Sequence, residues 1–156
     1  MSAIKPIKRS EQLSPLSREH HEALLLVWKI RQGLKNKIAP EEIAAYVHWF
    51  WNNHLHLHFS QEEHLLLPHL PGSDEMAKQL QAEHHEVREL IAGQLNAASL
   101  AVLAGKMNDH IRFEERKLFP HIEQKLSLGQ LNSIHKQLDQ QPHCAEKWEN
   151  EFWLKK

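Results

Sequence analysis

Two segments of this chain repeat one arrangement of histidine and glutamate that suits metal binding. The first holds His58 and Glu62, the second holds His110 and Glu114, and each glutamate stands four residues after its histidine. Positions i and i+4 of an α-helix lie on one face, one turn apart. If both segments are helical, each pair can therefore offer an imidazole and a carboxylate to the same metal ion.

A second duplicated phrase, Glu-His-His-Glu, occurs at residues 19–22 and 83–86. The order along the chain is therefore a lone histidine, a His/Glu pair, a lone histidine and a second pair. Four-helix bundles build two-metal carboxylate sites from inward-facing residues on each helix. The six expected metal ligands are His20, His58, Glu62, His84, His110 and Glu114.

The ligand types indicate which metals suit such a site. Imidazole and carboxylate together favour iron, manganese or zinc, and six protein ligands exceed the needs of one tetrahedral zinc ion. We therefore expect two metal ions, with the glutamates as bridges, because a carboxylate has two oxygens, and the histidines as terminal ligands. An open coordination position on such a pair would bind a small diatomic molecule.

Other nearby side chains leave alternatives open. His54 shares the face of His58 and could be a ligand or a hydrogen-bonding neighbour of one, whereas His21 or His85 could replace the adjacent histidine. Glu63 and Glu115 stand five residues after a histidine, about 140° around the helix from it. They are expected to be solvated or hydrogen-bonded to other helices.

Helices must position these residues, because the chain has only 5 glycines and lacks β-branched runs. Apolar residues at helical spacing predict an all-α, up-down-up-down four-helix bundle. The expected helices begin near residues 14, 40, 73 and 99 and end near residues 33–36, 67, 95 and 120. We expect Pro120 to kink or end the fourth helix. Antiparallel helices bring two motifs together only if both lie equally far from the loop that joins the helices. For each pair of neighbouring helices, these distances differ by at most four residues, about 6 Å along the helix axis.

We expect one domain over residues 1–156: an N-terminal extension (1–13), a metal-binding bundle (14–125) and a C-terminal helical tail (126–156). Trp148, Phe152 and Trp153 form an apolar cluster late in that tail. A solvated tail would rarely carry such a cluster. The tail is therefore expected to cover apolar surface, on its own bundle or in a homodimer.

The composition excludes several other classes of protein. The chain of 156 residues is 41% hydrophobic and has a formal net charge of -1, so no general attraction to nucleic acid is expected. Its single cysteine rules out an intrachain disulfide framework. No signal peptide or membrane span is visible, so we expect a cytoplasmic protein without a membrane partner.

These motifs resemble the hemerythrin-like (HHE cation-binding) family. The resemblance rests on residues 18–22, 54–68, 83–84 and 110–120, and extends over roughly residues 14–125. It implies a four-helix bundle around a non-haem di-iron centre that zinc or manganese could occupy by substitution. It also implies a small ligand, oxygen or nitric oxide, that the protein binds or senses. The alternatives are a di-iron enzyme acting on peroxide, nitric oxide or ferrous iron, and an accessory protein in iron handling or iron–sulfur repair.

Two departures from the oxygen-carrying hemerythrins bear on function. Those proteins have a His-x-x-x-His pair on the third helix, whereas here Arg88 stands four residues after His84. Their last carboxylate is an aspartate five residues after its histidine, whereas Glu114 follows His110 by four. The missing fifth histidine favours redox reaction or sensing over simple reversible oxygen carriage.

Overall fold

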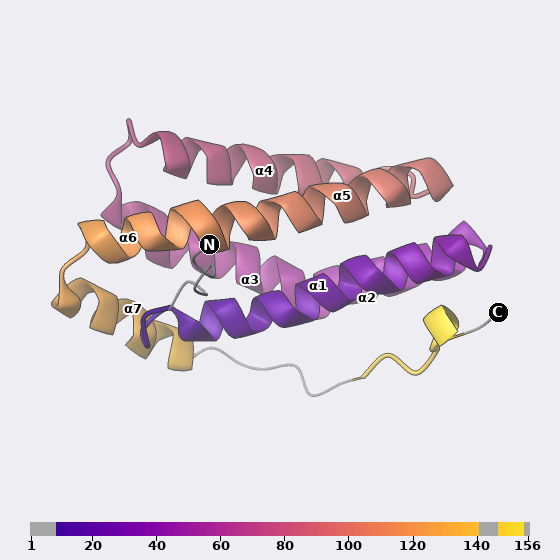
Figure 1. Cartoon of the computed structure of the whole chain (residues 1–156), viewed down its shortest axis with the longest axis horizontal. Coiled ribbons are helices and arrows are strands. Elements are labelled where there is room, and N and C mark those ends of the chain that lie inside the picture. The colour runs from indigo at the N-terminus through magenta and orange to yellow at the C-terminus, as the bar shows by residue number, and fades with distance from the viewer. Residues whose placement is uncertain (1–8, 141–146, 155–156) are drawn as a thin grey trace, which may run out of the picture.

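Four antiparallel helical rods make up most of the molecule (Figure 1). The computed structural model describes residues 9–140 and 147–154, and every regular element in these ranges is helical. The first and third rods are α1 (Ser14–Lys35) and α4 (Glu75–Ala92). The second rod comprises α2 (Pro40–Phe50), η1 (Trp51–Leu55), α3 (His56–Gln61), η2 (Glu62–Leu66) and η3 (Leu67–His69). The fourth comprises α5 (Ala97–Phe113), η4 (Glu114–Leu118) and α6 (Phe119–Lys125), and α7 (Leu128–Asp139) and η5 (Phe152–Leu154) follow. The expected all-α bundle is confirmed.

Both His/Glu segments leave regular α-helical geometry at the glutamate. The carbonyl of Glu62 accepts a hydrogen bond from the N–H of Leu67, and that of Glu114 from the N–H of Phe119. These i to i+5 bonds define π-helical turns, which occur frequently at functional sites. We predicted that Pro120 would kink or end the fourth helix. It does not end the helix, because α6 continues to Lys125. Pro120 lies in the first turn of α6, where a missing N–H is tolerated.

The apolar core is divided into two clusters, and the predicted metal ligands lie at the boundary between them on every rod. Along α1, for example, Leu16 belongs to one cluster and Leu26 to the other, with His20 between them. Along α4, Leu80 and Val87 are divided in the same way by His84. The bundle therefore contains a polar layer enclosed between two apolar halves.

The tail is only partly the helical segment that the sequence predicted. Helix α7 forms, but residues 147–151 are not helical and η5 is a single 3₁₀ turn. Residues 147–154 form a strap that runs along α1 and α2 (Figure 1). Asn150 donates a hydrogen bond of 2.7 Å to Glu42, and the fully buried Phe152 packs beside Gly33 of α1. A Cβ at Gly33 would lie 2.9 Å from the Phe152 ring, so the glycine makes room for it.

The expected N-terminal extension is described from residue 9 onward. Leu13 is fully buried, and Arg9 forms an ion pair of 2.7 Å with Glu123. The beginning of the extension, residues 1–8, lies outside the described residues, as do residues 141–146 and 155–156 of the tail. Within the described ranges, no helix is both long and apolar enough to cross a membrane.

Removing the Phe152 side chain should destabilise the protein. A buried Phe→Ala change typically costs about 3–5 kcal/mol, because it loses apolar burial and leaves a cavity. We therefore expect Phe152→Ala to lower the free energy of unfolding by about that amount in urea titrations. Leu154→Ala is the matched control, because Leu154 is 63% exposed. If both variants unfold at the same urea concentration as the parent, the strap does not stabilise the bundle.

Asp74 links the start of α4 to α6. Its carboxylate accepts hydrogen bonds from the Ala77 N–H (3.0 Å) and from His121 Nε2 (2.6 Å). Burial would raise the pKa of Asp74, but the bonds from His121 and the backbone lower it below its usual value.

Asp74→Ala should therefore lower the free energy of unfolding by about 1 kcal/mol at pH 7, the usual contribution of an N-cap. Because the folded pKa is depressed, this contribution is present above the unfolded pKa of about 3.9 and fades as the pH falls through the folded pKa. Asp74→Asn, which keeps a capping acceptor, should lose less. Unfolding measured at pH 7 and pH 3 checks this, and an Ala-variant deficit that does not shrink at pH 3 contradicts it.

Candidate metal centre

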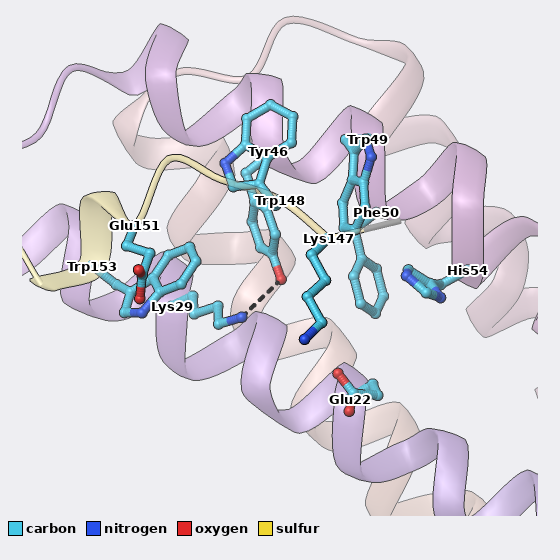
Figure 2. Close-up of a pocket in the computed structure, with 10 residues that line it drawn as sticks. All are labelled: Glu22, Lys29, Tyr46, Trp49, Phe50, His54, Lys147, Trp148, Glu151 and Trp153. Atoms are coloured by element: carbon cyan, nitrogen blue, oxygen red, sulfur yellow. Dashed lines mark hydrogen bonds between the residues drawn. The ribbon is translucent and has the colours of Figure 1, made fainter. Parts of the chain in front are cut away.

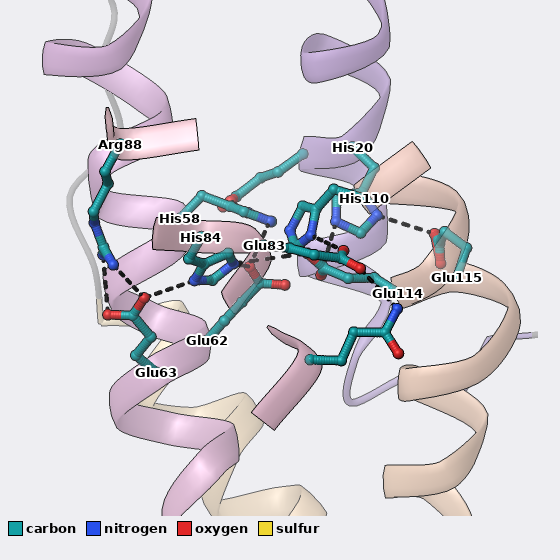
Figure 3. A network of polar contacts seen from close by, with 12 residues as sticks. His20, His58, Glu62, Glu63, Glu83, His84, Arg88, His110, Glu114 and Glu115 are labelled. Atoms are coloured by element: carbon teal, nitrogen blue, oxygen red, sulfur yellow. Dashed lines mark hydrogen bonds and ion pairs between the residues drawn. The ribbon is translucent and has the colours of Figure 1, made fainter. Parts of the chain in front are cut away.

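The four rods bring all six sequence-predicted ligands together in the polar layer (Figure 3). Each is at most 5% exposed. Their ligand atoms form two overlapping groups of four, and within each group these atoms lie within 4.8 Å of one another. The first group is His20, His58, Glu62 and Glu114, and the second is Glu62, His84, His110 and Glu114. The two groups thus share both glutamates.

Each shared glutamate lies against histidines of both groups. Glu62 Oε1 is 3.4 Å from His58 Nε2 and 3.1 Å from His84 Nε2. Glu114 Oε2 is 3.2 Å from His20 Nε2, and its Oε1 contacts His110 Nε2. The carboxylates therefore stand between the two histidine pairs, as bridging ligands would.

Several of these atoms are buried without a hydrogen bond. Among the described residues, they include Nε2 of His20, His58 and His110, Oε2 of Glu62 and both carboxylate oxygens of Glu114. An unpaired buried polar atom normally costs about 1–3 kcal/mol. When the imidazoles are neutral, these atoms are lone-pair donors that face one another, and a bound cation would satisfy them together. The donor set therefore fits a metal site.

A second set of four glutamates, here called the outer glutamates, faces the other ring nitrogen of each histidine. Three of these contacts are hydrogen bonds, whereas His20 Nδ1 lies near Glu115 without a hydrogen bond. Every one of these contacts crosses from one helix to its neighbour. The Nδ1–carboxylate pairs are His58 with Glu19 (2.6 Å), His84 with Glu63 (2.6 Å), His110 with Glu83 (2.7 Å) and His20 with Glu115 (3.4 Å). Such partners fix the ring orientation of a metal-binding histidine and leave Nε2 free for the metal.

Arginines anchor two of these outer glutamates. Arg88 binds both oxygens of Glu63, at 2.7 and 3.0 Å, and does not enter the ligand layer. Glu115 is 3.3 Å from Arg9 and accepts a hydrogen bond of 2.9 Å from Ser17. Although burial opposes it, the bonds from His84 and Arg88 lower the pKa of Glu63 to about 2. Glu63 is therefore a carboxylate at any physiological pH.

Burial and the neighbouring glutamates shift the pKa values of three histidines in this layer in different directions. Burial disfavours a charged imidazole, yet Glu62 and Glu19 raise the pKa of His58 to about 10. The pKa of His84 is raised by its glutamates against the same burial, whereas burial lowers that of His110. The pKa of the Glu62 carboxyl is well below its usual range, because His58 and His84 overcome its burial. Since metal ligation requires neutral imidazoles, metal binding at this centre would release protons.

The structure disfavours the alternative ligands. His21 and His85 are exposed, and His54 packs against the rings of Trp49 and Phe50, outside both groups of candidate ligands. For Glu63 and Glu115, the hydrogen-bonded alternative is the one observed. Glu19 and Glu83 were missed, although each directly precedes one of the lone histidines in the duplicated Glu-His-His-Glu phrase.

Comparison with known proteins agrees with the geometry of the site. The family model described as the hemerythrin HHE cation binding domain matches residues 12–122. Searches of curated proteins and of solved structures gave no match. The matched segment covers most of the chain and contains all six candidate ligands. The chain therefore belongs to the hemerythrin HHE cation-binding family.

Proposed function

We propose that the centre holds two iron ions and takes up a small diatomic molecule, oxygen or nitric oxide, for binding or sensing. The observation that carries this proposal is the sharing of Glu62 and Glu114 by two groups that each add two histidines. One ion would be held by His20 and His58 and the other by His84 and His110, with both carboxylates between them. Zinc or manganese could occupy the same donors.

When bound, the irons would supply electrons and unfilled coordination positions for the diatomic ligand. The residues of the chain do the rest. The outer glutamates hold the imidazoles of His58, His84 and His110 in the tautomer that presents Nε2. The two apolar clusters keep bulk water from the layer. Because each ion would have only four protein donors, the protein itself does not fill the coordination sphere that iron adopts with oxygen and nitrogen ligands.

The position of Arg88 supports a second candidate, a redox enzyme using the same centre on peroxide, nitric oxide or ferrous iron. Arg88 stands where a fifth histidine ligand occurs in oxygen carriers, and it binds Glu63 instead. One more coordination position on the metal would therefore be open for reaction. An accessory role in iron handling or iron–sulfur repair is the further alternative, and the single cysteine is compatible with a reducing cytoplasm for all three.

Optical spectroscopy tests the ligand proposal. Protein loaded with ferrous iron without oxygen should develop a new absorption band when oxygen or nitric oxide is added. A band that persists for minutes with one ligand supports binding or sensing. Rapid bleaching with continued consumption of that ligand or of peroxide supports the enzyme. A spectrum that none of the three molecules changes would rule out both.

Metal stoichiometry tests the assignment of the ligands. We expect about two metal atoms per chain after iron-replete expression, and less than one in Glu62→Ala or Glu114→Ala, because each of these carboxylates would serve both ions. Glu63→Ala and Glu115→Ala are matched controls one residue away. Each should weaken metal affinity by about 10–100-fold through a single histidine but retain the stoichiometry at saturating iron. Equal loss of stoichiometry at both positions of either pair would show that the ligand register is wrong.

A further inference from the structure

A cavity lies near the metal centre, between α1, α2 and the C-terminal strap (Figure 2). Its volume is about 620 Å³, within the range of small-molecule sites, about 300–1,000 Å³. The lining combines aromatic and charged side chains: Tyr46, Trp49, Phe50, Trp148 and Trp153 with Glu22, Lys29, His54, Lys147 and Glu151. None of these residues belongs to the candidate metal ligands.

Five aromatic side chains form one part of the wall. The Tyr46 ring lies 6.0 Å from that of Trp49, 5.8 Å from that of Trp148 and 5.6 Å from that of Trp153. At these distances the rings pack directly on one another, and Tyr46 is only 3% exposed. A flat ligand would therefore pack on the partly exposed surfaces of Trp49, Trp148 and Trp153. They therefore favour a planar aromatic molecule over a flexible or strongly hydrated one.

Lys29 supplies the polar anchor of the cavity. Its ammonium is 4.1 Å from the centre of the Trp153 ring and 3.5 Å from the Tyr46 hydroxyl. Among the described residues, no carboxylate lies within ion-pair distance of it. Burial lowers the pKa of Lys29, although Glu22 and Glu151 oppose this from further away. A partly desolvated ammonium without a close counter-ion is complementary to an anionic group on a ligand.

The surrounding charges limit what that anionic group can be. Lys147, Glu22 and Glu151 also line the cavity, so its lining carries two ammonium groups and two carboxylates. A doubly charged phosphate on Lys29 would meet both carboxylates. A cationic ligand is disfavoured as well, because the ammonium of Lys29 already occupies the face of Trp153. A single negative charge is the best match.

We propose that this cavity binds a planar aromatic monocarboxylate, with its ring against the partly exposed Trp49, Trp148 and Trp153 and its carboxylate on Lys29. The site is adjacent to the metal centre without being part of it. His54 lines the cavity one helical turn before His58, about 6 Å along the helix axis. Binding at this cavity does not require a loaded metal centre, so its test is independent of the proposed iron chemistry.

The probe is 2-naphthoate, titrated into the full-length protein by calorimetry, with neutral 2-naphthamide as a ligand of the same shape. We expect the acid to bind with a Kd below about 1 mM and the amide to bind at least about tenfold more weakly, because only the acid can pair with the ammonium. Lys29→Met keeps the length of the side chain and removes its charge. This variant should bind the acid about tenfold more weakly and bind the amide with unchanged affinity.

Lys35→Met is the matched control, since Lys35 is an exposed lysine on the same helix, and it should change neither affinity. The proposal is overturned if 2-naphthoate at 1 mM gives no binding signal, if acid and amide bind equally, or if Lys29→Met binds the acid as the parent does. If Lys29→Met does not fold, the comparison of acid and amide on the parent protein still tests whether the cavity recognises the negative charge of the ligand.

Discussion

The structure depends on one constraint: four imidazoles and two carboxylates are buried at the middle of an otherwise apolar bundle. Such groups are costly to bury unless charge and hydrogen-bonding capacity are matched. Without a metal, the raised pKa of His58, about 10, lets a proton on its imidazole match part of the carboxylate charge. Several Nε2 and carboxylate atoms remain without hydrogen-bond partners. A pair of cations between the shared glutamates would satisfy these atoms at once, so the polar layer makes physical sense as a metal site.

The outer glutamates relate this layer to the fold. Glu19 on the first rod supports a histidine of the second, Glu63 on the second supports the third, Glu83 on the third supports the fourth, and Glu115 on the fourth supports the first. The contacts thus form a closed circuit around the bundle. A slip of one rod by a residue would break two of them, because each rod both provides and receives one carboxylate. Ligand geometry and helix register therefore constrain each other.

Much of this was predictable from spacing. Residues four apart share a helix face, so the repeated His/Glu pairs and the lone histidines identified the six converging residues and the four rods. The histidine that each outer glutamate contacts was not predictable. It lies on another helix, and the contact depends on how the rods are rotated about their axes. The strap at residues 147–154 escaped prediction for a similar reason. Its conformation follows from the packing of Phe152 beside Gly33, not from a local helical pattern.

Anomalous X-ray diffraction at the iron edge from crystals of iron-loaded protein tests the central claim most directly. Two peaks are expected inside the bundle, one bonded to His20 and His58 and the other to His84 and His110. Glu62 and Glu114 should each contact both peaks. A single peak, or two peaks that do not share these carboxylates, would contradict the account.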